Sequence, residues 1–396
     1  MRLEYLLAQV AERRMNRRDA LRLMGLAGAS GTVAALGAAP LPVVAPRAAA
    51  LGTSEPVNDD MFDVAAVEAG AWAPGPYGQG DQRGSFNEVT PEKTAAALAL
   101  LDQRRPVKTY NLGELLFNGF PAFTHPALPP PRAYEQRLTV MGYPAPAGFA
   151  GIQQVAVAQG PNRISAHEER FSGTYQIATQ LDGLAHVGVG DMFYNGFRGP
   201  DIAATHGTTK LGNEHMGPIV TRGVVIDVLG LKVAEGARDA YFSTPNGQSV
   251  LHERYRISIS DIEAAMARQN IREITPGDVV LFRTGWNQLV RADPQRYAAV
   301  EPGIYLAEAR YLARFRPAII GADSWALETT NADVHKGNLF PVHQELLVRH
   351  GIRIGEAMLT DSLVADGISE FVFIVTPQLA LGATAGSTPP IALAQP

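Results

Sequence analysis

The chain has 396 residues, of which 46% are hydrophobic and 18% are charged, a composition typical of a folded globular protein. Its formal net charge is −5, and no basic run interleaves with aromatic residues along its body, which argues against nucleic acid as a partner. The absence of cysteine excludes disulfides, thiolate zinc sites and thiol nucleophiles, so any metal must be held by His, carboxylate, amide oxygen or water.

Residues 1–50 have the composition of a targeting segment. They hold seven arginines against three acidic residues, and no charge occurs from Leu23 to Val44. The order Asn16-Arg17-Arg18-Asp19-Ala20-Leu21, leading into a Gly/Ala-rich stretch, resembles a bacterial twin-arginine export signal. We therefore expect a periplasmic or extracellular protein with no stable membrane association after signal removal. An uncleaved anchor is the alternative, because the uncharged run is long enough to span a bilayer.

Residues 51–84 are interpreted as an N-terminal extension and residues 85–396 as one catalytic domain, because no repeat or low-complexity linker divides them. Thr90 as N-cap and Pro91 at the first helical position predict a helix. The Pro-rich segment 120–132 predicts a surface loop. The Val/Ile-rich run 219–228 predicts a strand covered on both faces. The order Ser260-Asp261-Ile262-Glu263 predicts a capping box that starts a short helix.

Strands and helices alternate through the rest of the chain. The turn at 276–278 leads into a strand predicted at 279–284. Further strands are expected at 318–322, 352–359 and 371–376, and helices at 306–315 and 341–350, the second stopped by Gly351. The helices are too sparse to flank every crossover, so the sequence predicts a mixed α/β fold and not a doubly wound sheet. No GxGxxG or Walker pattern follows a strand, which disfavours a nucleotide cofactor.

Two groups of imidazole and carboxylate side chains, far apart in the sequence, are the candidates for a metal-binding or catalytic site. Asp182 and His186 are four residues apart, and His343 and Glu356 follow far along the chain. An Asp near a His is more often a solvated or capping contact, so this pair alone is weak evidence. If the fold brings both groups together, the four side chains form a hydrolytic metal site.

The order of the segments around these residues resembles the metal-dependent cyclase family, which includes bacterial kynurenine formamidases and isatin hydrolases. The resemblance covers residues 85 to 395. It implies a swivelling β/β/α domain that assembles as a homodimer or homotetramer. The matching segments are Thr179–His186, 219–228, 274–286, 321–325, 343–347, Glu356 and 382–391.

The family motif is His-x-Gly-Thr-His-x-Asp-x-Pro-x-His, and Thr179, Asp182 and His186 match its Thr, Asp and final His. Other motif positions differ. Gln176 and Gln180 occupy the positions of the two leading His residues, and Ala178 and Leu184 occupy those of the Gly and the Pro. In relatives, those His and the Asp bind a first metal. An amide oxygen is a weaker ligand than imidazole, so the resemblance implies an empty first site or an oxygen-loving ion such as Mn²⁺, Mg²⁺ or Ca²⁺. Gln176 and Gln180 are thus candidate weak metal or substrate ligands.

Asp182, His186, His343 and Glu356 match the second metal site of binuclear relatives. They suffice for one divalent ion, Mn²⁺ or Zn²⁺, with a position open for water. Such an ion lowers the pKa of bound water from about 16 to about 7 and polarises a carbonyl under attack. Asp182 and His343 are assigned chiefly to the metal, and His186 and Glu356 to the metal or to catalytic proton transfer. The expected reaction is hydrolysis of a small amide, cyclic amide or lactone.

Four residues are candidates for binding the small-molecule substrate. Phe193, Tyr194 and Asn195 follow the motif and include aromatic rings suited to a planar ligand. Trp325 follows a buried strand, where site residues commonly lie. Packing accounts for these side chains equally well.

Two other functions remain open at this point. The first is a noncatalytic small-molecule-binding protein on the same fold, which has lost its catalytic activity because Gln176 and Gln180 occupy the two leading His positions. The second is a lyase or cyclase that uses the same ion to stabilise an enolate. Retention of all four metal-site residues favours the hydrolase over the binding protein.

Overall fold

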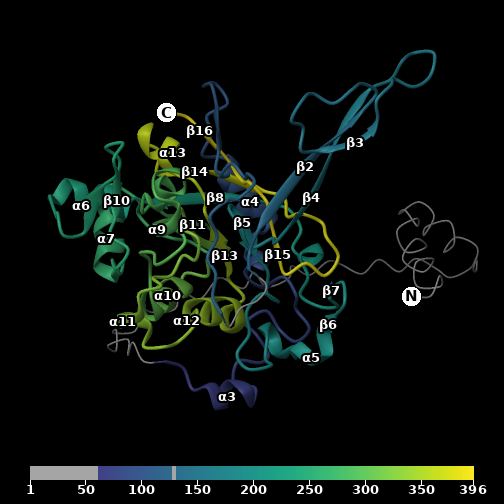
Figure 1. The fold of residues 1–396 in the computed structure, drawn as a ribbon. Coiled ribbons are helices and arrows are strands. Elements are labelled where there is room, and N and C mark those ends of the chain that lie inside the picture. The colour runs from purple at the N-terminus through teal and green to yellow at the C-terminus, as the bar shows by residue number, and fades with distance from the viewer. Residues whose placement is uncertain (1–60, 127–130) are drawn as a thin grey trace, which may run out of the picture. The chain divides into compact units, whose positions relative to one another are not determined.

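The computed structural model describes residues 61–126 and 131–396, and the export signal predicted at 1–50 lies outside these ranges. Within them, no helix is long and apolar enough to cross a membrane. The fold is built on a nine-stranded mixed sheet (Figure 1). In spatial order the strands are β1 (Lys108–Asn111), β16 (Ile391–Ala394), β14 (Glu370–Val375), β8 (Ile219–Ile226), β11 (Val279–Phe282), β12 (Ile319–Ala322), β13 (Arg353–Glu356), β5 (Gln180–Asp182) and β15 (Ala385–Gly386).

Four parallel strands, β8, β11, β12 and β13, form the centre of this sheet, and antiparallel strands extend it on both sides. Every residue of β11, β12 and β13 is buried, as expected for parallel strands covered on both faces. Strand β8 ends at Ile226, because the Asp227 side chain accepts a hydrogen bond from Gly230 N and caps the next helix. The predicted mixed α/β fold is confirmed.

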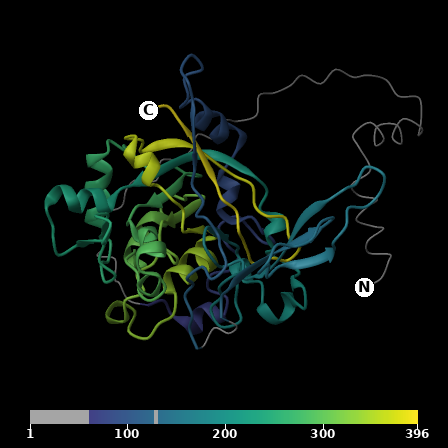
Figure 2. The ribbon, with the colours of Figure 1, turned by 45° about the horizontal axis from the view of Figure 1, so that its top comes forward.

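Adjacent residues of the central strands point into two different cores. Val224 and Val280 belong to one core, whereas Val225 and Val279 belong to the other. The first core is closed by helices, which lie together on one face of the sheet (Figures 1 and 2). These helices are α6 (Val228–Glu235), α7 (Ile259–Arg268), α10 (Leu306–Ala313), α12 (Pro341–His343) and the π-helix Gln344–His350.

The second core lies on the opposite face of the sheet, where α4 (Pro91–Leu98) runs against β8. Shorter elements complete the described chain. The remaining helices are α3 (Val64–Glu68), α5 (Gly199–Ile202), α8 (Leu289–Ala292), α9 (Pro294–Tyr297), α11 (Ala332–His335) and α13 (Asp361–Ala365), with 3₁₀ turns at Gly84–Glu88, Tyr194–Gly196, Asn213–His215 and Trp286–Gln288. Two small ribbons pair β6 (Ala203–Ala204) with β7 (Gly207–Thr208) and β9 (Tyr241–Ser243) with β10 (Ser249–Leu251).

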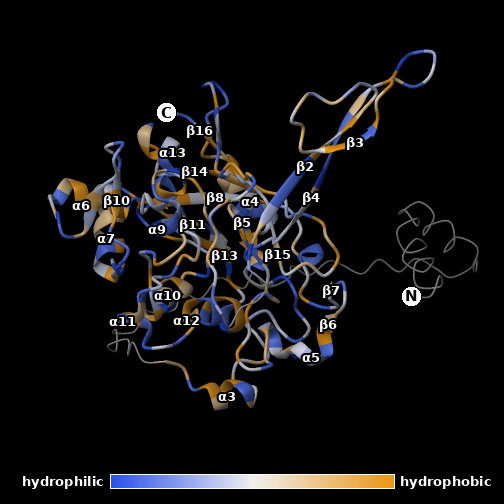
Figure 3. Cartoon of the chain, in the orientation of Figure 1, coloured by the Kyte–Doolittle hydropathy of each residue, from blue (hydrophilic) through white to orange (hydrophobic). Residues whose placement is uncertain are grey.

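A separate three-stranded sheet projects away from the main one (Figures 1 and 2). It consists of β2 (Tyr134–Met141) between β3 (Ile152–Val155) and β4 (Ala166–Gly173). Seven of the eight residues of β4 are exposed. The strands are hydrophilic where β2 starts and more hydrophobic toward the far end (Figure 3). We call this sheet the arm.

Most local signals in the sequence are confirmed, with one correction. Thr90 caps α4 by accepting a hydrogen bond from Lys93 N, and Pro91 is its first residue. The helix predicted after Ser260 starts earlier, at Ile259. Its N-cap is Ser258, whose side chain accepts from Asp261 N while the Asp261 side chain accepts from Ser258 N. The capping box was therefore misplaced by two residues, because Asp261 fills the role expected of Glu263.

Candidate metal centre

The pairing of β5 between β13 and β15 brings the two distant groups together. In this register Glu356 lies opposite Gln180, and Asp182 lies opposite Ala385. After Asp182 the chain turns at Gly183, where any added Cβ would come within 2.7 Å of Thr384 O. His186 N donates to Gly183 O at 3.1 Å, which turns the chain back toward β5.

His343, the last residue of α12, approaches the same point from the helical face of the sheet. Its Nε2 atom is 3.4 Å from Asp182 Oδ2 and 3.2 Å from Glu356 Oε1. His186 Nε2 is 3.8 Å from the same Asp182 oxygen. One ligand atom from each of Asp182, His186 and His343 lies within 4.8 Å of the others. The predicted four residues are therefore neighbours, with Glu356 beside this group of three.

Asp182 supplies an independent test of whether a metal fits. Its side chain is fully buried, and neither oxygen accepts a hydrogen bond from any described residue. A buried ionised carboxylate that accepts no hydrogen bond is strongly unfavourable. Its contacts to His343 and His186 are 3.4 and 3.8 Å long, and a divalent cation would compensate its charge more fully. Ligand atoms in a tetrahedral zinc site are roughly 3.3 Å apart, close to the separations from His343 Nε2. The donor set of one carboxylate and two imidazoles therefore fits a divalent ion.

The charges around His343 favour a cation at its Nε2 atom. Burial alone would lower the pKa of His343, but the carboxylates of Asp182, Glu328 and Glu356 raise it well above its usual value. Burial would raise the pKa of Asp182, but His186 and His343 lower it. Burial and the charge of Asp182 together raise the pKa of Glu356, whereas burial lowers the pKa of His186. A proton and a metal ion compete for the same imidazole nitrogen, so this environment stabilises either one.

Glu328 is a functional residue that the sequence did not reveal. It is fully buried, and its Oε1 atom lies 2.6 Å from His343 Nδ1. The backbone N–H groups of Val342 and His343 also donate to its carboxylate. This contact fixes the ring so that Nε2 faces Asp182, the usual role of a carboxylate behind a metal-binding His. No motif marks this role, because it depends on the packing of α12 against a loop.

Gln176 and Gln180 each contact one of the predicted site residues. Gln176 Nε2 lies 3.3 Å from His186 Nδ1 and 3.3 Å from Thr384 Oγ1. Gln180 Nε2 donates to Glu356 Oε2, while Gln180 Oε1 is buried without a hydrogen-bond partner among the described residues. Both amides thus orient neighbouring side chains, and only Gln180 keeps a free buried oxygen.

A cavity of about 470 Å³ opens beside these residues. Its lining includes His186, His343, Glu356 and Gln176, and also Trp325, one of the four predicted substrate-binding residues. Polar and aromatic side chains together make a wall suited to a small organic molecule.

The structure does not bring Phe193, Tyr194 and Asn195 to the lining of this cavity. Tyr194 is fully buried and its hydroxyl donates to Asp81 Oδ2. Asn195 accepts from Gly75 N and donates to backbone oxygens of residues 78 and 81. Tyr194 and Asn195 therefore pack against residues 75–81, before α4, the packing role that the sequence also allowed.

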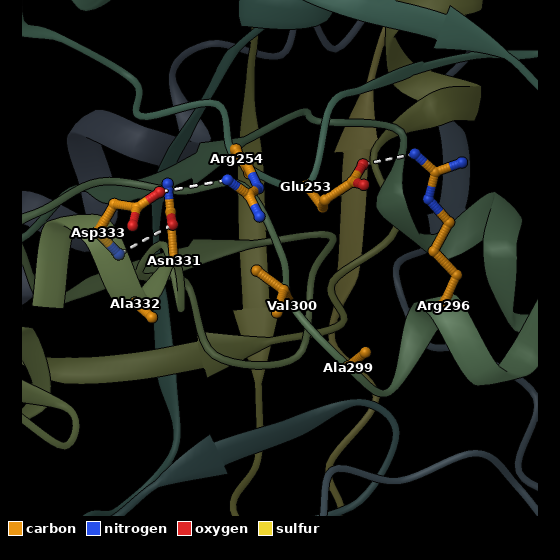
Figure 4. Close-up of a pocket in the computed structure, with 8 residues that line it drawn as sticks. All are labelled: Glu253, Arg254, Arg296, Ala299, Val300, Asn331, Ala332 and Asp333. Atoms are coloured by element: carbon orange, nitrogen blue, oxygen red, sulfur yellow. Dashed lines mark hydrogen bonds and ion pairs between the residues drawn. The ribbon is translucent and has the colours of Figure 1, made fainter. Parts of the chain in front are cut away.

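A second cavity, of about 260 Å³, shares no lining residue with the first (Figure 4). Its charged side chains are paired with one another: Arg254 with Asp333 at 3.2 Å, and Arg296 with Glu253. A cavity whose charges already neutralise each other offers little to a charged ligand. We therefore place the chemistry at the first cavity.

Comparisons with known proteins show the family and the fold of the chain. The family model described as "Putative cyclase" matches residues 84–329. The crystal structure of a protein described as a novel cyclase is 28% identical, with a TM-score of 0.64 over 81% of this chain and 98% of its own. A search of curated proteins gave no match.

Two isatin hydrolase structures are more distant and support the fold alone. Isatin hydrolase A from Ralstonia solanacearum is 17% identical, with a TM-score of 0.50 over 76% of this chain and 95% of its own. An isatin hydrolase bound to the product analogue thioisatinate is 16% identical, with a TM-score of 0.51 over 78% of this chain and 100% of its own.

The variant Asp182→Asn tests the metal centre. We expect purified wild-type protein to bind close to one equivalent of Mn²⁺ or Zn²⁺ and the variant to lose at least tenfold in affinity, because an amide removes the charge that compensates the ion. Equilibrium dialysis with elemental analysis measures both. The matched control Asp333→Asn, at an exposed ion pair, should bind metal as wild type does. Equal affinity in Asp182→Asn and wild type would place the ion elsewhere.

Proposed function

Because the chain belongs to the cyclase family, we propose that it is a metal-dependent hydrolase of a small amide, cyclic amide or lactone. The observation that carries this proposal is the buried carboxylate of Asp182, which accepts no hydrogen bond from the described residues and lies beside two imidazoles and an organic-sized cavity. In this proposal Asp182, His186 and His343 hold one divalent ion, Mn²⁺ or Zn²⁺, because one ligand atom from each lies within 4.8 Å of the others.

Glu356 is the proton carrier in this proposal. A divalent ion at the site supplies activation of a water molecule and polarisation of the substrate carbonyl. Glu356 Oε1 lies next to the ligand His343, and the side chain lines the cavity, so it can accept a proton from the attacking water. It can then return the proton to the leaving nitrogen or oxygen. Gln180 holds the other carboxylate oxygen and so fixes its direction.

The variant Glu356→Gln separates proton transfer from metal binding. We expect it to retain one equivalent of metal but to lose about 10²-fold or more in kcat, because an amide cannot accept the proton. The probes are formanilide, phthalimide and dihydrocoumarin, an amide, a cyclic amide and a lactone, each assayed with added Mn²⁺ or Zn²⁺. Chelation of the metal should abolish the wild-type activity. The control Glu273→Gln, at an exposed residue between α7 and β11, should leave it unchanged.

The same assay identifies the alternatives. Metal-loaded protein that turns over no member of the panel would contradict hydrolysis of these bonds. If such protein still bound the probes tightly, a binding protein would be favoured. Product analysis separates hydrolysis from a lyase reaction, because only hydrolysis incorporates oxygen from ¹⁸O-labelled water.

We also propose that the protein is a homo-oligomer, either a dimer or a tetramer, in which a second copy covers the arm. Strand β4 of the arm exposes Phe171, and the segment that joins β3 to β4 exposes Val157 and Ile164. Strand β4 is almost wholly exposed, and on β2 only Thr139 and Val140 are buried, so the arm buries little apolar surface by itself, which supports a covering partner.

Substitutions that introduce charge at Val157 and Ile164 test this assembly. We expect the double variant Val157→Lys, Ile164→Lys to shift the protein toward monomer, because burying two ammonium groups is unfavourable. Sedimentation velocity measures the mass. The control Val233→Lys, at an exposed position on α6, should keep the wild-type mass. A monomeric wild type would contradict the proposal.

The third proposal is export by the twin-arginine route, which rests on the arginine pair and the uncharged run in residues 1–50. In a bacterial host, we expect the full chain in the periplasmic or extracellular fraction with its first residues removed. The variant Arg17→Lys, Arg18→Lys should stay in the cytoplasm with an intact N-terminus. Mass spectrometry of the fractions distinguishes the two, and equal export of both would contradict this route.

A further inference from the structure

One cationic side chain lines the cavity beside the metal centre. Arg132 lines this cavity and also the small pocket between Gln180, Trp325 and Glu356. It is half-buried, and it is the only Lys or Arg among the described residues of either lining. Within the described ranges, no hydrogen bond or ion pair holds its guanidinium. It shares both linings with Glu356, and its charge lowers the pKa of that carboxyl group and of Asp182.

A rigid aromatic wall lies across the same cavity. The Trp325 ring stacks on Phe123, with centroids 4.4 Å apart and planes 14° apart. Phe340 meets Phe123 edge-on, at 5.7 Å and 90°. The backbone N–H of Trp325 donates to Glu301 Oε2 at 2.7 Å, and its indole Nε1 donates to Tyr297 O at 2.7 Å. The wall is therefore held in position before any ligand arrives, and it offers a surface to a flat apolar group.

When a divalent ion occupies the metal centre, the acidic side chains near Arg132 interact with that ion, and Arg132 can bind a ligand. A divalent ion offsets the negative charges of Asp182 and Glu356. Glu328 is satisfied by His343 Nδ1 and two backbone N–H groups, and it does not line the cavity. Arg132 then remains the one cationic side chain of the described lining residues that no hydrogen bond or ion pair holds, in surroundings where charge attraction is stronger than in bulk water.

We propose that Arg132 is the anion-binding residue of the substrate site and that the substrate is an aromatic compound bearing a carboxylate or a similar anionic group. The proposal rests on the proposed function, because the scissile amide or ester group must reach Asp182 and His343 while the anionic group reaches Arg132. The ring lies against Trp325. A planar guanidinium binds such an oxyanion through two parallel hydrogen bonds, which fixes the substrate as well as attracting it.

A pair of probes isolates the anion contact from the metal. Benzenesulfonate carries a charge but is a poor metal ligand, and methyl phenyl sulfone has a similar shape without the charge. We expect metal-loaded wild-type protein to bind benzenesulfonate at least about 10-fold more tightly than the sulfone, as a charge-assisted hydrogen bond implies. Isothermal titration calorimetry measures both affinities. The variant Arg132→Gln should remove the preference, and Arg132→Lys should keep part of it.

The matched control Arg272→Gln, at an exposed residue between α7 and β11, should retain the full preference. If Arg132→Gln keeps the preference, or if wild type shows none, the proposal is overturned. An equal loss of affinity for both probes in Arg132→Gln would also overturn it, because that is the result of a purely structural role or of balancing the acidic side chains.

The same samples distinguish failure of this inference from failure of the proposed function. Metal content is measured in wild type and in Arg132→Gln, and both should hold one equivalent. A protein that binds no metal would contradict the proposed function. The probes can then be titrated into the metal-free protein, where a preference removed by Arg132→Gln still supports the anion site.

Discussion

The buried carboxylate of Asp182 is the constraint on which the rest of the site depends. It lies at the end of β5, held between β13 and β15, so the sheet itself fixes its position. Neither oxygen has a hydrogen bond from the described residues. Removing such a charge from water is costly unless a cation replaces the solvent. The placement of His186 and His343 around it, and of Glu328 behind His343, is what that cation would require.

The two glutamines explain how one ion can suffice. In the cyclase motif their positions carry His, whereas here each amide contacts a neighbouring side chain. Gln180 donates to Glu356 and Gln176 lies against His186. These contacts orient Glu356 and His186. In the proposed function, one group of residues binds the ion, the Glu356 carboxylate carries the proton and the cavity wall binds the substrate.

The sequence predicted the features that depend on local patterns. The cap at Thr90, the buried strand β8 and the stop at Gly351 follow from turn chemistry and apolar runs. Asp182 and His343 were identified through the family motif and its order. Glu328 and Arg132 could not be identified in this way, because their roles arise from side chains that meet only after folding. Residues 193–195 were predicted to bind substrate because they follow the motif, but Tyr194 and Asn195 instead contact residues 81 and 75.

The proposed metal centre and the proposed hydrolysis both depend on where a divalent ion binds. The most direct measurement is an anomalous difference map from crystals of the protein loaded with Mn²⁺ or Zn²⁺. If the proposed centre is correct, the map has one strong peak within about 2.3 Å of an oxygen of Asp182 and of the Nε2 atoms of His186 and His343. A map with no peak there, or with its strongest peak at other residues, would contradict the proposed centre and the hydrolysis built on it.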